Sequence, residues 1–269
     1  MGGLFRVLTD SAWTEWLPIL AWLIDHPEGP IVVDAGETAR TAEPDYFPDW
    51  HPYYRRAVQM DVKPEQEIGP QLRALGLEPT DVRRLVLTHF HTDHVGGLHH
   101  FPGVEILVSG SDWKRARGLT GRLQGYLPQH WPSWFAPVAI PFASDVTFES
   151  WPLTNAGDVR VVRTAGHTPG HVSVIVESDG IDYLLAGDTS YTQRLLLRER
   201  PDGVSPRPSV ALRTMDRILA HAAERPTVYL PTHDPESVSR LERNILLAPT
   251  ALRIAQSARA PRVPAARAS

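Results

Sequence analysis

The feature that most constrains this chain is the segment THFHTDHVGG at positions 88–97, which places three histidines and one aspartate within six residues. It follows a short apolar run, so it stands where a predicted strand ends and a helix begins. In an extended segment His89 and His91 point to the same side, because side chains alternate along a strand. Asp93 and His94 follow in the turn and can reach a second point nearby. One continuous segment can therefore offer ligands to two metal ions.

Three later positions repeat this arrangement of an apolar run, a small-residue turn and a metal-ligand side chain. They are His167 in AGHTPGH, Asp188 in AGDTSY and His233 in LPTHD. Each alone could be a helix cap, a turn residue or a buried polar group, but four strand ends with one arrangement argue against coincidence. The chain has no cysteine, so disulfides, thiolate ligands and cysteine nucleophiles are excluded. Imidazole and carboxylate ligands suit Zn, Fe, Mn or Co.

Short apolar, β-branched runs alternate with helix-like segments through most of the chain. The predicted strands are Leu17–Ile24, Ile31–Asp34, Arg84–Thr88, Glu105–Ser109, Val159–Arg163, Val172–Glu177, Tyr183–Ala186 and Val228–Leu230. The predicted helices are Pro64–Leu75, Ser111–Arg117, Pro208–Ala223 and Pro235–Leu247. Strands in both halves, with helices between them, favour a layered α/β architecture.

Length and charge narrow the class of protein further. We expect one domain over residues 1–257 and a surface tail, Ala258–Ser269, rich in Ala, Arg and Pro. The net charge of −4 gives no electrostatic reason to expect nucleic acid or a membrane as partner. The N-terminus lacks a signal-peptide pattern, and the early apolar stretch is too short to span a bilayer. A cytoplasmic location is therefore the default expectation.

Together the ligand residues resemble the metallo-β-lactamase superfamily, whose mark is His-X-His-X-Asp-His followed by later His, Asp and His ligands. The resemblance extends from the turn at 33–36 to His233, and it implies an α/β fold: a four-layer αβ/βα sandwich of two mixed β-sheets flanked by helices. It also implies two divalent metal ions, with zinc favoured and Fe, Mn or Co as alternatives. The implied ligands are His89, His91 and His167 for the first metal, Asp93, His94 and His233 for the second, and Asp188 as the bridge. Asp34 matches a family aspartate that supports the metal loop.

The other histidines lie outside this ligand set. We expect His171, in the same turn as His167, to support the ligands or the fold. Surface or packing roles are expected for His26, His51, His99, His100, His130 and His221.

The reaction that the resemblance implies is hydrolysis. Two divalent ions can lower the pKa of a bridging water from about 15.7 toward neutrality. Because the chain has no cysteine and no glycine elbow around a serine, the resulting metal-bridging hydroxide is the simplest nucleophile. Superfamily membership alone does not choose among ester, thioester, lactone, lactam and phosphodiester substrates.

Tyr191, three residues after Asp188, is the best discriminator among these substrates. Its spacing resembles the N-acyl homoserine lactone lactonases, in which a phenol lies beside the metals and hydrogen-bonds to the substrate, and residues 22–29 resemble the same family. We therefore expect lactone-ring opening of N-acyl homoserine lactones (quorum quenching), with Asp93, Asp188 and Tyr191 as catalytic residues. The alternative reading of Tyr191 is an ordinary buried tyrosine.

Two aromatic segments fit a small-molecule substrate with an apolar acyl tail. They are the cluster between Tyr46 and Tyr54 and the irregular stretch Gly118–Phe142. Each could be a lid or an apolar pocket wall, and each could equally be packed on the core. Exposed rings would also suit a homodimer.

Several rivals share the metal motif. They include another lactonase or esterase and a hydroxyacyl-glutathione thioesterase, which should carry a basic C-terminal helical region. A nuclease or phosphodiesterase should show a basic face. A di-iron redox protein should carry an acidic ligand in the motif and a flavin domain, and a non-catalytic metal-binding module should have lost ligands.

Overall fold

Two β-sheets form the centre of the computed structural model, which describes residues 7–9, 12–144 and 146–248. The first sheet contains β1 (Trp22–Ile24), β2 (Ile31–Val33), β3 (Arg84–Val86), β4 (Glu105–Val108) and β5 (Val138–Ala139), in that order. The second has the order β10-β9-β8-β7-β6 and contains β6 (Ser150–Pro152), β7 (Val159–Arg163), β8 (Val172–Ser178), β9 (Ile181–Gly187) and β10 (Thr227–Pro231). Both sheets are mixed. Only the β1–β2 pair is antiparallel in the first, and only the β9–β10 pair is parallel in the second.

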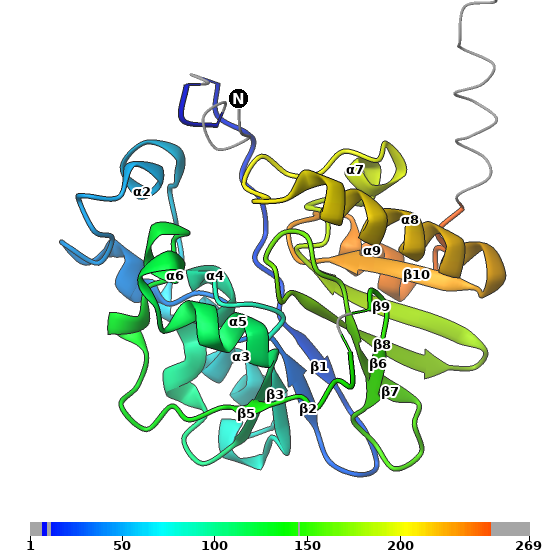
Figure 1. Cartoon of the computed structure of the whole chain (residues 1–269). Helices are drawn as coiled ribbons and strands as arrows, with labels where there is room; N and C mark the ends of the chain where they lie inside the picture. Colours follow the sequence, from blue (N-terminus) through cyan, green and yellow to red (C-terminus); the bar gives the residue numbers. More distant parts are fainter. Residues whose placement is uncertain (1–6, 10–11, 145, 249–269) are drawn as a thin grey trace, which may run out of the picture.

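Helices cover the outer face of each sheet (Figure 1). The helices that accompany the first sheet are α2 (Pro52–Ala57), α3 (Ile68–Ala74), α4 (Thr92–Val95), α5 (Gly110–Ala116) and α6 (Leu119–Leu123). Those that accompany the second are α7 (Gln193–Leu197), α8 (Pro208–Glu224) and α9 (Ser237–Glu242). Five short 3₁₀ turns complete the described elements: Ala39–Ala42, Pro64–Gln66, Pro79–Asp81, Gly96–His100 and Pro128–His130. The predicted sandwich of two mixed sheets flanked by helices is confirmed.

Alternating side chains of the strands build three apolar layers. In β2, Val33 packs between the sheets, while Val32 faces the helices of the first half. In β10 the pattern repeats, since Val228 joins the layer between the sheets and Tyr229 packs with α7 and α8. The central strands, such as β2 and β10, are thus buried on both faces, which explains why they read as continuous apolar runs.

Some element boundaries differ from the sequence prediction. The strand predicted at Leu17–Ile24 forms only over β1, because the backbone N–H of Leu20 donates to Thr232 O instead of joining a ladder. The helix predicted at Pro64–Leu75 is split into a 3₁₀ turn and α3, and the one predicted at Pro235–Leu247 is shortened to α9. Strands β5 and β6 and helices α2, α6 and α7 were not predicted, whereas α4 begins within residues 88–97, where a helix start was expected. The predicted tail lies outside the described residues.

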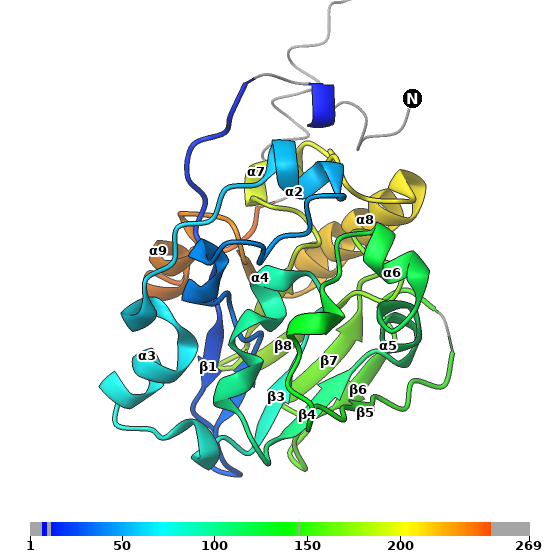
Figure 2. The ribbon, with the colours of Figure 1, turned by 90° about the vertical axis from the view of Figure 1, so that its left-hand side faces the viewer.

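The strand ends place the candidate ligands at one edge of the molecule. Strands β7, β9 and β10 run in the same direction, so their carboxyl ends meet at the same edge of the second sheet. The carboxyl end of β3 delivers residues 88–94 to this edge from the first sheet. Helices α2 and α7 lie at that edge, above the strands in Figures 1 and 2. Among the described residues, no helix has the length and apolar character to cross a membrane.

Candidate metal centre

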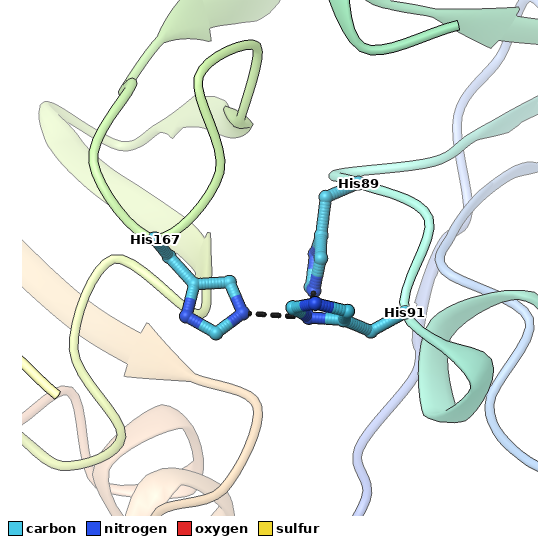
Figure 3. A group of neighbouring side chains, drawn as sticks. All are labelled: His89, His91 and His167. Carbon is cyan, nitrogen blue, oxygen red and sulfur yellow. Dashed lines mark hydrogen bonds between the residues drawn. The ribbon is translucent and has the colours of Figure 1, made fainter. Parts of the chain in front are cut away.

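Three histidines from the two sheets converge on one point (Figure 3). Nε2 of His89 lies 2.9 Å from Nδ1 of His91, which in turn lies 2.8 Å from Nε2 of His167. His89 and His91 follow β3, whereas His167 follows β7. Three imidazole nitrogens that face one another cannot all be matched as donor and acceptor, since a neutral ring has one of each. A cation bound to all three lone pairs would satisfy them.

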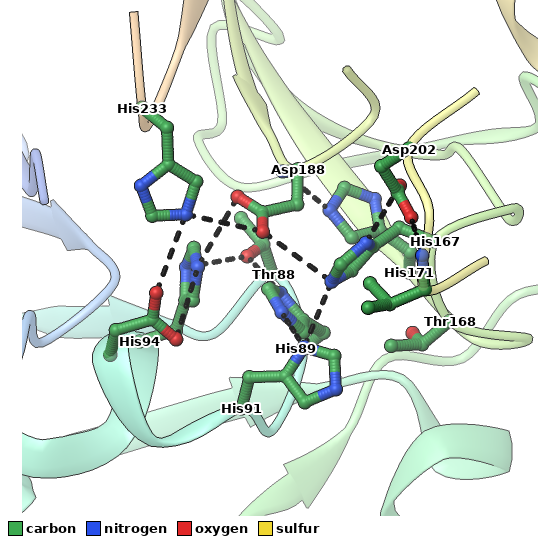
Figure 4. A network of polar contacts seen from close by, with 12 residues as sticks. Thr88, His89, His91, His94, His167, Thr168, His171, Asp188, Asp202 and His233 are labelled. Carbon is green, nitrogen blue, oxygen red and sulfur yellow. Dashed lines mark hydrogen bonds and ion pairs between the residues drawn. The ribbon is translucent and has the colours of Figure 1, made fainter. Parts of the chain in front are cut away.

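A second group lies beside the first and contains Asp93, His94 and His233. Nε2 of His233 lies 3.3 Å from a carboxylate oxygen of Asp93. Asp188 stands between the two groups, with its oxygens 3.3 Å from Nε2 of His94, 3.3 Å from Nε2 of His233 and 3.4 Å from Nε2 of His167 (Figure 4). The structure therefore brings together all seven residues that the sequence predicted as ligands.

Each of the five histidines has its other ring nitrogen held by a group outside the centre. The pairs are His89 Nδ1 with Thr88 Oγ1 at 3.0 Å, His91 Nε2 with Gln124 O at 3.2 Å, His94 Nδ1 with Asp34 Oδ2 at 2.8 Å, His167 Nδ1 with Asp202 Oδ2 at 2.9 Å, and His233 Nδ1 with Pro18 O at 2.9 Å. Such outer partners fix ring orientation and tautomer at metal sites. Every ring thus turns a nitrogen toward the centre.

Asp34 fastens the histidine loop to the first sheet. Its carboxylate accepts hydrogen bonds from the backbone N–H of Thr88 at 2.8 Å and from the Thr88 hydroxyl at 2.9 Å, besides contacting His94. Asp34 has a φ of 62°, a left-handed conformation that is uncommon for a residue other than glycine. The role expected for Asp34, to support the metal loop, matches these contacts.

The contacts of the turn before Asp188 explain why a glycine precedes it in the AGDTSY motif. His171 accepts the backbone N–H of Asp188 through Nε2 at 3.0 Å, and its Nδ1 lies 2.9 Å from Thr164 Oγ1. A Cβ on Gly187 would lie only 2.7 Å from Nε2 of His171, and the glycine has a φ of 54°. His171 therefore supports Asp188 from behind, as the sequence predicted.

The donor set fits divalent cations. Nε2 of His94 and Oδ1 of Asp188 are buried and form no hydrogen bond with any described residue. A buried polar atom without a partner is costly, and both atoms face other ligand atoms. Within each of three overlapping groups at this edge, the ligand atoms lie within 4.8 Å of one another. Five imidazoles and two carboxylates without thiolate are ligands that suit zinc and similar ions.

The electrostatics of the two groups differ. Burial, together with the neighbouring imidazoles, lowers the pKa of His89 well below its usual value and that of His91 to about 3. Both rings are therefore neutral, as metal ligands must be. Burial acts to lower the pKa of His233 as well, but Asp188 and Asp93 overcome it and raise that pKa to about 10. The carboxylates that favour a proton on His233 would equally favour a metal cation.

A cavity of about 280 Å³ opens beside the ligands His91, Asp93, His167 and Asp188. Its remaining wall is largely apolar or aromatic and comes from Tyr53, Tyr54, Val58, Met60, Leu123, Tyr126, Tyr191, Val204, Pro206 and Pro208, among others. Both aromatic segments singled out in the sequence thus contribute to a pocket wall. His51, for which a surface or packing role was expected, is buried and also lines this cavity.

Tyr191 lies at the metal ligands rather than in the core. Its ring centroid is 4.9 Å from that of His233 and 6.0 Å from that of His167, and the residue lines the cavity. Burial raises the pKa of Tyr191 well above its usual value, and the nearby Tyr53 and Asp188 add to the effect. Its phenol is therefore a neutral hydrogen-bond donor beside the candidate metal centre.

Sequence reasoning missed several groups that complete the site. Asp202, which contacts His167, lies in an Asp-Gly turn and reads only as a turn residue. The carbonyl groups of Pro18 and Gln124 carry no side-chain signal at all. Tyr53 was noted only as one of a cluster of rings.

Comparisons with known proteins agree with this geometry. The model of the Metallo-beta-lactamase superfamily matches residues 14–235. The N-acyl homoserine lactonase AttM of Rhizobium radiobacter is 24% identical over 243 residues, covering 84% of this chain and 86% of its own length. The N-acyl homoserine lactonase AiiA of Bacillus thuringiensis subsp. kurstaki is 26% identical over 224 residues, covering 82% of each.

Solved structures show the same fold. An N-acyl homoserine lactone hydrolase with the product N-hexanoyl-L-homoserine bound at its catalytic metal centre superposes with a TM-score of 0.68 and 23% sequence identity. The superposition covers 89% of this chain and 90% of the other. The resemblance predicted from the sequence is confirmed.

Proposed function

This chain belongs to the metallo-beta-lactamase superfamily of hydrolases, and on that premise we propose that it opens the lactone ring of N-acyl homoserine lactones. Two divalent cations, with zinc favoured, would be held by the predicted residues: His89, His91 and His167 for one, Asp93, His94 and His233 for the other, and Asp188 between them. Bound there, the cations would supply a water of near-neutral pKa and polarise the ester carbonyl.

The observation that carries this proposal is the position of Tyr191, beside the ligand histidines and inside a cavity with an apolar wall. Its hydroxyl forms no hydrogen bond with any described residue, so it is available to a substrate. A phenol there can donate to the ester carbonyl oxygen as negative charge develops, and then to the departing alkoxide of the opened ring. The lactonases AttM and AiiA, similar over most of this chain, support the same substrate.

The cavity wall supports an acylated substrate. Val58, Met60, Leu123 and Val204 offer apolar surface within the same cavity as the ligands. An acyl tail that leaves water for such a surface gains about 0.8 kcal/mol for each buried CH₂ group. A lactone carried next to Tyr191 would therefore be held by its tail as well as by its ring.

Acid release at neutral pH tests the proposal. Purified protein should open short- and long-chain N-acyl homoserine lactones, should lose this activity after chelation, and should not cleave lactoylglutathione. Thioester cleavage without lactone opening would contradict the substrate and favour the thioesterase alternative. Stoichiometric metal without hydrolysis of ester, lactone or thioester would favour a metal-binding module.

Tyr191→Phe sharpens the test, because it removes one hydroxyl and touches no ligand. We expect metal content to stay unchanged and kcat/KM on lactones to fall roughly 10²-fold, the loss typical of one oxyanion donor. Tyr183→Phe is the matched control, since the Tyr183 phenol donates to Asn244 Oδ1 at 2.8 Å and Tyr183 is not among the residues that line the cavity. Full activity of Tyr191→Phe on the best lactone would remove the main support for the substrate.

A further inference from the structure

A second tyrosine, Tyr53, shares the cavity with Tyr191. It comes from α2, on the side of the first sheet, whereas Tyr191 follows β9 of the second sheet. Its hydroxyl forms no hydrogen bond with any described residue, yet it is not among the buried polar atoms that lack a partner. The Tyr53 hydroxyl is therefore exposed within the cavity and free to bind a ligand.

Tyr53 lines the cavity that also contains the candidate ligands Asp93 and Asp188. Its own helix and the segment after it provide Tyr54, Val58 and Met60, which line the same cavity. A group bound by Tyr53 would therefore lie in the cavity that the candidate ligands and the apolar wall share.

The helix that carries Tyr53 is fastened to residues 123–125, part of which also lines the cavity. His51, which precedes α2, bonds through Nε2 to Leu123 O at 3.2 Å, and the Tyr54 hydroxyl donates to Gly125 O. Both carbonyls belong to the segment that also holds His91 through Gln124 O. Tyr53 thus belongs to a helix that is bonded to the segment holding the ligand His91, and such support keeps a binding group in a fixed position relative to the reacting atoms.

An N-acyl homoserine lactone offers two carbonyl groups to such a pair of phenols. The ring ester must lie at the metals and Tyr191, and this step rests on the function proposed above. The amide is attached to the ring carbon next to the ester carbonyl, and the acyl tail continues beyond it. We infer that Tyr53 donates a hydrogen bond to the amide carbonyl oxygen, and so makes the site selective for lactones that carry an N-acyl group.

Burial also keeps Tyr53 protonated. It raises the pKa of this phenol well above its usual value, and the charges of Asp93, Asp188 and Asp202 add to that effect. A neutral phenol can donate to a carbonyl oxygen over the whole pH range in which the enzyme would work. Phenylalanine at this position would leave the ring and its packing while removing the donor.

Two lactones separate this role from the ring-opening step. N-hexanoyl homoserine lactone carries the amide, and α-hexyl-γ-butyrolactone carries an apolar tail on the same ring carbon but no amide. For metal-loaded Tyr53→Phe we expect kcat/KM on the amide substrate to fall about tenfold, mainly through KM, as for loss of one neutral hydrogen bond. Activity on the alkyl lactone should not change. Tyr191→Phe should lose activity on both, and Tyr183→Phe on neither.

Metal content and melting temperature of each variant show whether the site is intact. An equal loss on both lactones in Tyr53→Phe would overturn the inference, because the phenol would then act on the ester or on the fold. No loss on either would overturn it as well. Both results leave wild-type lactone opening in place, so they differ from failure of the proposed function, in which the wild-type protein opens neither lactone and both proposals fall.

Discussion

Within the part of the chain that the structure describes, histidines and carboxylates have ligand atoms close enough to hold a metal ion in two regions, of which one has the other properties of a metal centre. One is the group around Asp188, which contains the seven candidate ligands at the edge of the two sheets. The other consists of Glu67, His99 and His100, with both Nε2 atoms on one oxygen of Glu67, at 3.1 Å and 2.7 Å. Proximity alone therefore does not distinguish them.

The two groups differ in what satisfies their inner atoms. The second oxygen of Glu67 accepts the backbone N–H of Ala39 at 2.9 Å and the Thr38 hydroxyl at 3.1 Å, so the carboxylate is fully bonded. By contrast, Oδ1 of Asp188 is buried and has no hydrogen bond from a described residue. The side chains of the Glu67 group are satisfied by the protein itself, whereas those of the Asp188 group need a cation. Unsatisfied buried atoms, rather than residue types, mark the metal site.

Asp188→Asn should have the largest effect and would test this contrast directly. An amide carries no charge that could neutralise a bound cation, so we expect loss of metal and a fall in kcat/KM on the order of 10³-fold or more, because free water has a pKa of about 15.7. Glu67→Gln is the matched control: it makes the same chemical change in a buried carboxylate that contacts two histidines. Metal analysis and lactone hydrolysis of both variants check the prediction. Loss of metal from Glu67→Gln would contradict the distinction.

Asp202→Asn should have the next largest effect. Asp202 contacts Nδ1 of His167 at 2.9 Å and is itself held by the backbone N–H groups of Val204 and Ser205. Removing its charge should weaken the His167 ligand, and changes in such outer partners cost about 10- to 100-fold in metal affinity or activity. Competition with a chelator measures the affinity. Unchanged affinity would show that the contact does not tune the ligand.

Features that depend on residue type and on the spacing of apolar residues could be predicted from the sequence. Contacts that depend on the path of the backbone could not. The candidate ligands could be recognised because imidazoles and carboxylates followed four apolar runs. These runs form buried strands whose carboxyl ends meet at a common edge. Asp202 could not be predicted, since its role depends on how the loop before α8 folds back toward His167. The carbonyl groups of Pro18 and Gln124 belong to every residue alike and give no signal.

The elements of the fold also differ in whether the sequence predicts them. Strands that are buried on both faces were found with small errors in their ends. The short edge strands β5 and β6 were missed because β5 has only two residues and β6 is mostly polar or exposed. Helices of five residues, such as α6 and α7, are too short to show a periodic pattern, so tertiary contacts determine whether they form.

The pH dependence of stability should differ between metal-free and metal-loaded protein. In the metal-free protein the carboxylates raise the pKa of His233 to about 10, against about 6.5 in an unfolded chain. A raised pKa contributes stability that is fully present below about pH 6.5 and is lost as the pH rises through about 10. Metal-bound imidazole is neutral and lacks this dependence.

The difference in melting temperature between the two forms should therefore widen from pH 6.5 to pH 9. Calorimetry on metal-loaded and chelator-treated samples measures it. His233→Gln should reduce the widening, because it removes one of three rings, with His94 and His167, whose pKa the surrounding carboxylates raise. If this difference in melting temperature narrowed with rising pH instead, the proton on His233 in the metal-free protein would not occupy the position at which a cation binds.

His99→Ala should have the smallest effect, and it completes the comparison of the two groups. The His99 side chain is 45% exposed, and Glu67 keeps its bonds to His100, Thr38 and Ala39 without it. We expect the free energy of unfolding to change by no more than about 0.5 kcal/mol, as for most surface substitutions. Metal content should equal that of the wild type, because no ion is needed to satisfy these atoms. Loss of one metal equivalent in His99→Ala would show instead that a well-bonded carboxylate can still hold a cation, and burial of unsatisfied atoms would then cease to separate the two groups.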